Sequence, residues 1–255
     1  MDGIWSRRGL FLIGGQVIAG ASLGQALERL AVAQPRDAID WKRLFATKPE
    51  GGTGRVKQVT GIAFANQRRL TPGATVRSGE QLRVAKAGRL MVSIEDGTLL
   101  QLREGTVLDF SPGTHNSGVL HLVSGAILTV VPTTHRYLIH GPVAVIGVKG
   151  TVFYRQVFTE NEDSALAMEN QRVPVPGAGL KDYFCTCNGA VDYLRLDDLS
   201  LVASDTAQHH NAFILNPKNP KLLEKFPMVN HFDQDIKECI DLQDGPKHDS
   251  HFLKP

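Results

Sequence analysis

The sequence lacks the features by which several large classes of protein are recognised. Its formal net charge is only +2 and no run of lysine and arginine stands out, so nothing in it indicates a nucleic-acid partner. It contains no G-x-S-x-G, no H-E-x-x-H and no phosphate-binding loop, and its paired acids have no partner base. We therefore expect no enzyme activity. Cysteine is scarce, at three residues among 255, so each one has to be accounted for.

Long apolar runs are also missing, apart from an interrupted stretch near the N-terminus. Arg7 and Arg8 precede "GLFLIGGQVIAGASL", which is too short and too broken by glycine for a comfortable membrane span. Small residues that suit cleavage follow at 31–33, with an earlier option at 19–21. "SRRGLFL" resembles the twin-arginine export motif. We expect residues 1–33 to be an export signal and the protein to be periplasmic, or membrane-anchored if the signal is retained.

The body of the chain has the pattern of a mainly β protein. Residues 34–54 are polar and predict a spacer or a short helix. From Arg55 onward apolar and polar residues alternate, and turn residues recur at intervals of ~8–12 positions. Asp96-Gly97, between two alternating runs, is a strong turn signal. These features predict an all-β sandwich, barrel or solenoid.

Four segments follow one another in a recognisable order. They are "GRVKQVTGIAF", "LTPGATVRSGEQLRVAKAGRLMVSIEDGTLLQLREGTVLDF", "LHLVSGAILTVV" and "HGPVAVIGVKGTVFYRQV". The closing pattern of the last and most specific segment consists of Gly147, Lys149, Gly150, Thr151 and Phe153. Together the segments resemble the FecR domain of bacterial envelope proteins. The resemblance covers residues 55–158 and implies a FecR-like β-solenoid or sandwich domain there. Independently of it, Gly150 before Thr151 indicates a bulge or a close backbone approach at the start of a strand.

The resemblance stops short of the family's signalling members. Those that control sigma factors add a cytoplasmic helical segment, a membrane span and a C-terminal domain that contacts a receptor, and none of these is visible here. We therefore do not carry over the iron-signalling role. We expect a non-enzymatic periplasmic module for binding, sensing or scaffolding, whose partner is an unidentified envelope protein or ligand, and which meets the membrane only through its signal or anchor.

Residues 159–255 predict a small C-terminal extension of strands and one helix. The order "FCTCNGAV", "HHNAFIL" and "NHFDQDI" within it resembles an extension of some exported FecR-domain proteins. Asn230 is the expected cap of the helix. Its expected apolar face consists of Phe232, Ile236, Cys239 and Ile240. Cys239 is therefore most simply a core thiol.

The extension also carries the candidate metal ligands. Side chains alternate along a strand, so Cys185 and Cys187 share a face with Cβ atoms ~6–7 Å apart, too far for a disulfide unless the chain kinks. His209 and His210 point to opposite faces if they lie on a strand, so at most one can join the cysteines. His231 lies off the apolar helix face. A set of two cysteines and two histidines suits zinc best, with copper as the second option.

Other interpretations of these cysteines and histidines stay open. The cysteines can form a disulfide with each other or with Cys239, or they can be isolated thiols beside unrelated histidines. A solvent-exposed pair of Cys185 and Cys187 would indicate a thiol or metal redox protein instead of a binding module. A long uncovered edge strand would indicate an envelope structural protein. Four further histidines are expected to be solvated or hydrogen-bonded, namely His115, His121, His135 and His140.

Overall fold

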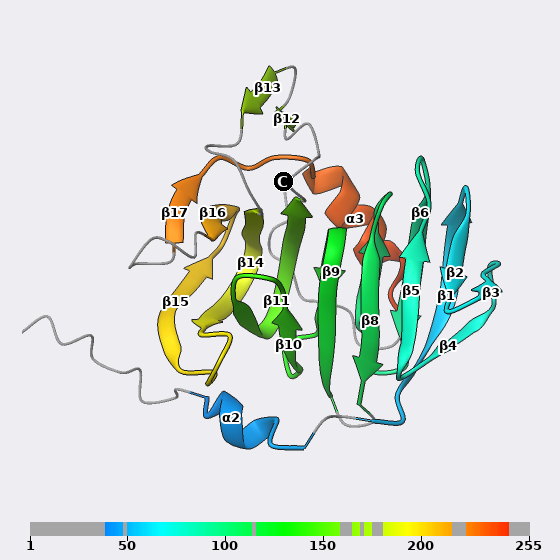
Figure 1. Ribbon diagram of the computed structural model, residues 1–255, viewed down its shortest axis with the longest axis horizontal. Helices are drawn as coiled ribbons and strands as arrows, with labels where there is room; N and C mark the ends of the chain where they lie inside the picture. Colours follow the sequence, from blue (N-terminus) through cyan, green and yellow to red (C-terminus); the bar gives the residue numbers. More distant parts are fainter. Residues whose placement is uncertain are drawn as a thin grey trace, which may run out of the picture. The chain divides into compact units, whose positions relative to one another are not determined.

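The structure is a computed structural model, shown as a ribbon in Figure 1. It describes residues 39–47, 50–113, 116–158, 165–168, 171–174, 181–215 and 223–244. The expected export signal at 1–33 and His115 lie outside these residues. In the described part of the chain, no helix has the length and apolar character needed to cross a membrane.

The fold is mainly β, as the sequence predicted. The main path of the sheet is, in spatial order, β17 (Leu223–Phe226), β16 (Asn211–Leu215), β14 (Lys181–Leu194), β11 (Val145–Phe158), β10 (Arg136–His140), β9 (Ser117–Val130), β7 (Leu99–Leu102), β6 (Arg89–Ile94), β1 (Thr53–Thr60) and β4 (Thr75–Arg77). Attached beside it are β15 (Leu201–Ala207), β8 (Val107–Pro112), β5 (Glu80–Val84), β2 (Ala63–Ala65) and β3 (Arg68–Arg69). Two further strands, β12 (Ala165–Met168) and β13 (Gln171–Pro174), form a separate hairpin. Within the described residues, the helices are α2 (Trp41–Leu44) and α3 (Asp233–Leu242).

Three strands of 14 residues each, β9, β11 and β14, organise the sheet. Each has different partners along its two halves: β14, for example, pairs with β16 at residues 182–186 and with β15 at residues 189–194. The pairing of β10 with β9 is parallel, and the other strand pairs are antiparallel. A long strand can change partners in this way only where the sheet bends.

The bend in β11 lies at Gly150, which confirms the predicted bulge. The register of β11 against β14 shifts between Lys149 and Val152. Gly150 has a φ of +58°, and a Cβ there would lie 2.3 Å from the Cα of Thr133. A side chain would therefore meet both backbone strain and a clash, so only glycine suits this position.

The predicted turn at Asp96-Gly97 is also confirmed. Gly97 has a φ of +88° and joins β6 to β7. The carboxylate of Asp96 accepts hydrogen bonds from the backbone N–H of Thr98 at 2.8 Å and from the hydroxyl of Tyr137 at 2.6 Å. Asp96 therefore both stabilises the turn and connects it to Tyr137 of β10.

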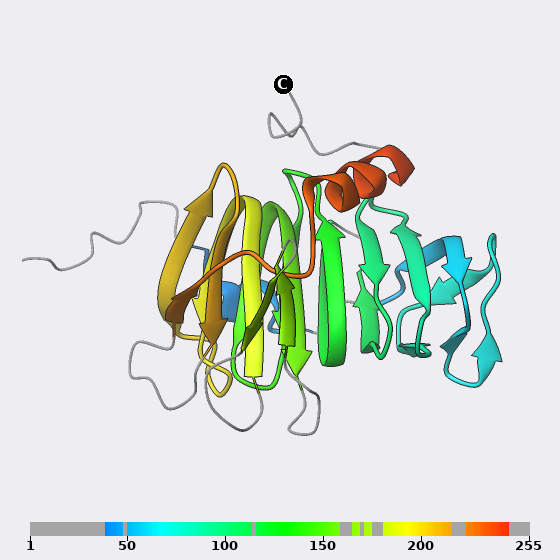
Figure 2. The same ribbon diagram turned by 90° about the horizontal axis from the view of Figure 1, so that it is seen from above.

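Two hydrophobic clusters lie on opposite sides of the sheet. The larger cluster contains the inward residues of the FecR-like strands, including Leu82, Val92 and Phe110. The smaller cluster lies under α3, which packs against β7 and β9, as Figure 2 shows from above. Both faces of the central strands are covered, so the residues on both faces are apolar.

Helix α3 begins later than the sequence predicted. Its N-cap is Phe232, whose backbone N–H donates to the carboxylate of Asp235 at 2.9 Å. Asn230 is therefore not the cap, since it has a φ of +60° and donates its side-chain amide to Gln156. Phe232 is 44% exposed and is not on the buried face. That face consists of Ile236, Cys239 and Ile240.

The polar segment before the sheet contributes one large buried side chain. Trp41 of α2 is 3% exposed, and its indole N–H donates to the carboxylate of Asp192 at 2.7 Å. The ring lies over Gly147, where a Cβ would be 2.4 Å from the indole. The glycine of the FecR-like closing segment therefore makes room for a tryptophan about a hundred residues earlier.

A buried ion pair joins β11 to β14. Arg155 and Asp182 are both 0% exposed, with the guanidinium Nε 2.9 Å from one carboxylate oxygen. Arg155 also donates to the carbonyls of Ile139 and Ala144. Every polar group of the pair thus has partners, which a buried charge requires.

We predict that Arg155→Met lowers the free energy of unfolding by about 3–5 kcal/mol, because Asp182 is left as an unpaired buried charge. Urea unfolding followed by circular dichroism measures the change. The double variant Arg155→Met with Asp182→Leu should recover most of the loss, since neither charge then remains. A double variant as unstable as the single one would contradict this account.

Candidate metal centre

The two closely spaced cysteines lie on β14 and face the cluster under α3. Cys185 and Cys187 are both 0% exposed and share one face of the strand, as alternation requires. Their sulfurs are 3.9 Å apart. All three cysteines of the chain are in the described part, and none forms a disulfide.

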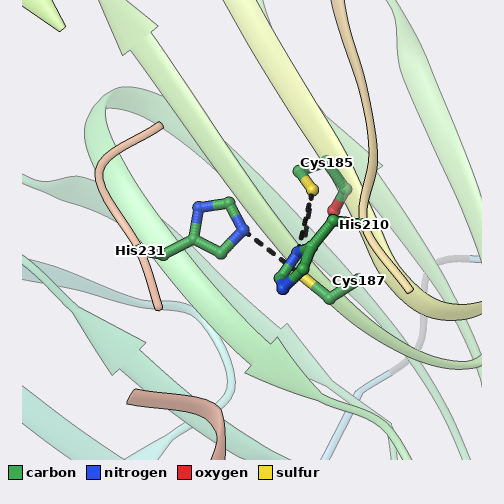
Figure 3. A group of neighbouring side chains, drawn as sticks. All are labelled: Cys185, Cys187, His210 and His231. Atoms are coloured by element: carbon green, nitrogen blue, oxygen red, sulfur yellow. Dashed lines mark hydrogen bonds between the residues drawn. The ribbon is translucent and has the colours of Figure 1, made fainter. Parts of the chain in front are cut away.

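Two histidines reach these sulfurs from different segments, as Figure 3 shows. His210 lies between β15 and β16, with its Nδ1 3.5 Å from the Sγ of Cys185. Its backbone N–H donates to the carbonyl of Cys187, and its φ of +26° turns the chain toward β14. His231 lies just before α3, with its Nε2 3.3 Å from the Sγ of Cys187. We call Cys185, Cys187, His210 and His231 the cage.

The spacing within the cage fits a tetrahedral ion. Its four ligand atoms all lie within 4.8 Å of one another. Zn–S bonds of ~2.3 Å and Zn–N bonds of ~2.0 Å place two sulfurs ~3.8 Å apart and a sulfur and a nitrogen ~3.5 Å apart. In the structure the sulfurs are 3.9 Å apart, and two separations between sulfur and nitrogen are 3.5 and 3.3 Å. The side chains therefore need little movement to bind one metal ion.

Hydrogen bonds on the far side of each ring direct the correct nitrogen at the sulfurs. The Nδ1 of His231 lies 2.7 Å from the carbonyl oxygen of Val229, to which it donates, and this turns Nε2 toward the Sγ of Cys187. The Nε2 of His210 donates to the carboxylate of Asp233 at 2.9 Å, and this turns Nδ1 toward the Sγ of Cys185. Metal-binding histidines are usually oriented by such outer partners. The ring of His231 also stacks on Tyr154, with centroids 4.4 Å apart.

The pKa values of the two thiols shift in opposite directions. Burial opposes ionisation of Cys185, but hydrogen bonds from Cys187 and the two histidines lower the pKa of its thiol to about 3. Burial and the neighbouring Cys185 both raise the pKa of Cys187. Burial lowers the pKa of His210, yet its contacts with Cys185 and Asp233 outweigh this and raise it. Without metal, the cage thus holds a thiolate beside protons that a bound cation would displace.

The remaining candidate, His209, is not part of the cage. Its side chain is 64% exposed, and its Nε2 lies 3.6 Å from the carboxylate of Asp233. His209, His210 and Asp233 form a second group of ligand atoms within 4.8 Å of one another. Of the five predicted ligands, the structure brings four together and leaves His209 at the surface beside them.

The three β-domain histidines that the structure describes do not belong to the cage. His121 pairs with Asp109 at 3.2 Å, and His135 is hydrogen-bonded to Thr134. For His140, burial is the main cause that lowers the pKa to about 4, helped by the charges of His121 and Arg155.

Asp233 and Asp235, at the start of α3, both have side-chain partners that the sequence does not show. Asp233 orients His210. Asp235 accepts from the N-cap of α3 and forms an ion pair with Arg103 at 3.0 Å. Asp233 follows the candidate ligand His231 by two residues, and this closeness in sequence was the available signal that the acid lies beside the metal ligands.

Fold and site together define a β-sheet protein with a buried Cys₂His₂ group near the C-terminal end of its sheet. Residues 80–173 match the model of the family described as FecR protein. The chain therefore contains a FecR domain, as the sequence predicted. All four cage residues lie beyond the matched segment, so the family match does not account for the site.

Other comparisons add little to this assignment. No curated protein matches the chain. Two crystal structures of a "putative anti-sigma factor" from Parabacteroides distasonis ATCC 8503 are similar at 16% identity, with a TM-score of 0.40. The match covers 62% of this chain and 62% of theirs, so the chain spans less than two thirds of that protein.

We predict three free thiols per chain in protein purified without reductant and then denatured with a chelator. The expectation follows because no disulfide links Cys185, Cys187 or Cys239. Titration with a thiol reagent gives the count, and fully reduced protein is the control. A count of one would show instead that two of the cysteines are oxidised to a disulfide.

Proposed function

We propose that the protein is an exported, non-enzymatic FecR-domain module whose C-terminal extension is held in place by a structural zinc ion. The single observation that carries the metal assignment is that the four cage ligand atoms lie within 4.8 Å of one another, with the two sulfurs 3.9 Å apart. The FecR domain supplies the β framework, and the extension adds the site to it.

Zinc is favoured by the chemistry of the donor set. Two thiolates and two imidazoles form a ligand set common in structural zinc sites, and four protein ligands leave no open position for a substrate. Copper is the second candidate, since it also accepts thiolate and imidazole ligands. The cysteines, His210 and His231 come from three separate segments, so one ion would connect the sheet, the β15–β16 turn and the start of α3.

Burial speaks against a role in thiol redox chemistry. A reactive dithiol has to meet its substrate, whereas Cys185 and Cys187 are 0% exposed. The lowered pKa of Cys185 is the one observation that favours a redox role. A lowered pKa also suits a metal ligand, because zinc binds thiolates and not thiols.

Location and partner are proposed from the sequence. Arg7 and Arg8 before the apolar stretch support export to the periplasm, where thiols are oxidised unless a metal protects them. A zinc ion in the cage would keep both neighbouring thiols from pairing. We propose that the module serves binding, sensing or scaffolding in the envelope, with an envelope protein or ligand as its partner.

We expect protein purified without chelator to carry one zinc ion per chain, measured by elemental analysis. Cys185→Ala and His231→Ala should each abolish stoichiometric zinc, because three ligands hold the ion far less tightly than four. Cys239→Ala is the matched control, since Cys239 is also buried but lies on the inner face of α3 outside the cage. Equal zinc in all variants, or none in the wild type, would refute the assignment.

We also expect removal of the metal to loosen α3 before the rest of the sheet. A ligand present at a thousandfold above its Kd stabilises the folded state by about 4 kcal/mol, and here the ion acts next to the helix start. Hydrogen exchange should show lost protection at residues 233–242 after chelation, with β9 and β11 still protected. A variant without the cage should show no further change on chelation. Uniform loss of protection would indicate a global role instead.

A further inference from the structure

The cage is closed to solvent on most sides, which raises the question of how an ion reaches it. Cys185, Cys187 and His231 are 0% exposed, and the side chain of His210 is 5% exposed. His231 is also covered by the ring of Tyr154. Among these four ligands, His210 is therefore the one that reaches toward the surface.

Two exposed metal-binding side chains stand at that surface beside His210. The side chains of His209 and Asp233 are 64% and 54% exposed. The carboxylate of Asp233 is 2.9 Å from the Nε2 of His210 and 3.6 Å from the Nε2 of His209. We call His209 and Asp233 the docking pair. Their ligand atoms lie within 4.8 Å of each other and of a ligand atom of His210.

His210 thus links two places where a cation can bind. Its Nδ1 faces the Sγ of Cys185 inside the cage, while its Nε2 faces Asp233 outside. Asp233 provides a negative charge at the solvent side, which raises the local concentration of cations. One imidazole and one carboxylate, with water as the other ligands, suit a divalent ion such as zinc or cobalt. Two protein ligands bind it weakly enough to release it.

We propose that His209 and Asp233 form an exposed docking site for a divalent metal ion, from which the ion passes by His210 into the cage. This inference rests on the proposed metal cage and adds a second site to it. The docking pair increases the rates of metal binding and metal release equally, because the ion only passes through it. The equilibrium affinity for the ion is set by the four ligands of the cage.

The test is the rate of cobalt uptake by reduced, metal-free full-length protein in a stopped-flow instrument. Cobalt bound to thiolates absorbs in the near ultraviolet and visible, so the signal reports the cage and not the docking pair. We expect His209→Ala to slow uptake about tenfold, because the docking site loses one of its two protein ligands, and a factor of ten corresponds to about 1.4 kcal/mol. Release to a chelator should slow by the same factor, with the equilibrium affinity and the final spectrum unchanged.

His121→Ala is the matched control. His121 also forms an exposed pair with an acid, at 3.2 Å from Asp109, but neither residue belongs to a metal-binding group with the cage. Its removal should leave the cobalt uptake rate unchanged. Equal slowing in both variants would overturn the docking site, because a general loss of surface histidine would then explain the result.

The remaining outcomes separate this inference from the proposed function. If the wild type takes up no cobalt with a thiolate spectrum, the cage itself is absent and both proposals fall. If cobalt enters the wild type and His209→Ala at the same rate, only the docking site is overturned. If His209→Ala weakens the equilibrium affinity or alters the spectrum, His209 is a ligand of the bound ion, and a docking role is equally excluded.

Discussion

The pairing of β14 with β11 is the constraint on which the rest of the extension depends. Twelve positions of β14, from Lys181 to Leu194, pair with β11 of the FecR-like segment. Cys185 is paired on both sides, with Tyr154 of β11 and Ala212 of β16. Cys187 lies at an irregularity of the register, between the pairs made by Thr186 and Asn188, and its carbonyl accepts the backbone N–H of His210. The site is therefore anchored by the domain that the family match covers, although no cage residue lies within the match.

The same strand pair holds the buried ion pair and the bend. Arg155 and Asp182 join β11 to β14 near one end, while Gly150 and Gly189 lie together near the middle, where a Cβ on Gly189 would meet the carbonyl oxygen of Gly150 at 2.7 Å. Beyond Gly189 the strand leaves β16 and pairs with β15. The change of partner creates the β15–β16 turn, and this turn carries His210 to the cysteines.

The sequence was most informative where a local rule decides the geometry. Alternation placed both cysteines on one face, and turn chemistry identified Asp96-Gly97. It failed where tertiary contacts decide. His210 enters the cage because its φ of +26° belongs to a turn and not to a strand. Asp233 acts through a ring 23 residues away. Nothing local predicts either contact, just as nothing in the polar segment shows that Trp41 packs on Gly147.

A metal ion would add to the contacts that already hold α3, which are a small apolar face and the ion pairs of Asp235 with Arg103 and of Glu238 with Arg89. Helices as short as the 10 residues of α3 are marginal in water, and its buried face packs only on the smaller cluster. The contacts of the cage close chain segments of 25 and 44 residues. Closing a longer loop costs only slightly more entropy than closing a short one. The first turn is the costly step in forming a helix. One ion bound by His231, two residues before α3 begins, would therefore order the helix at that first turn.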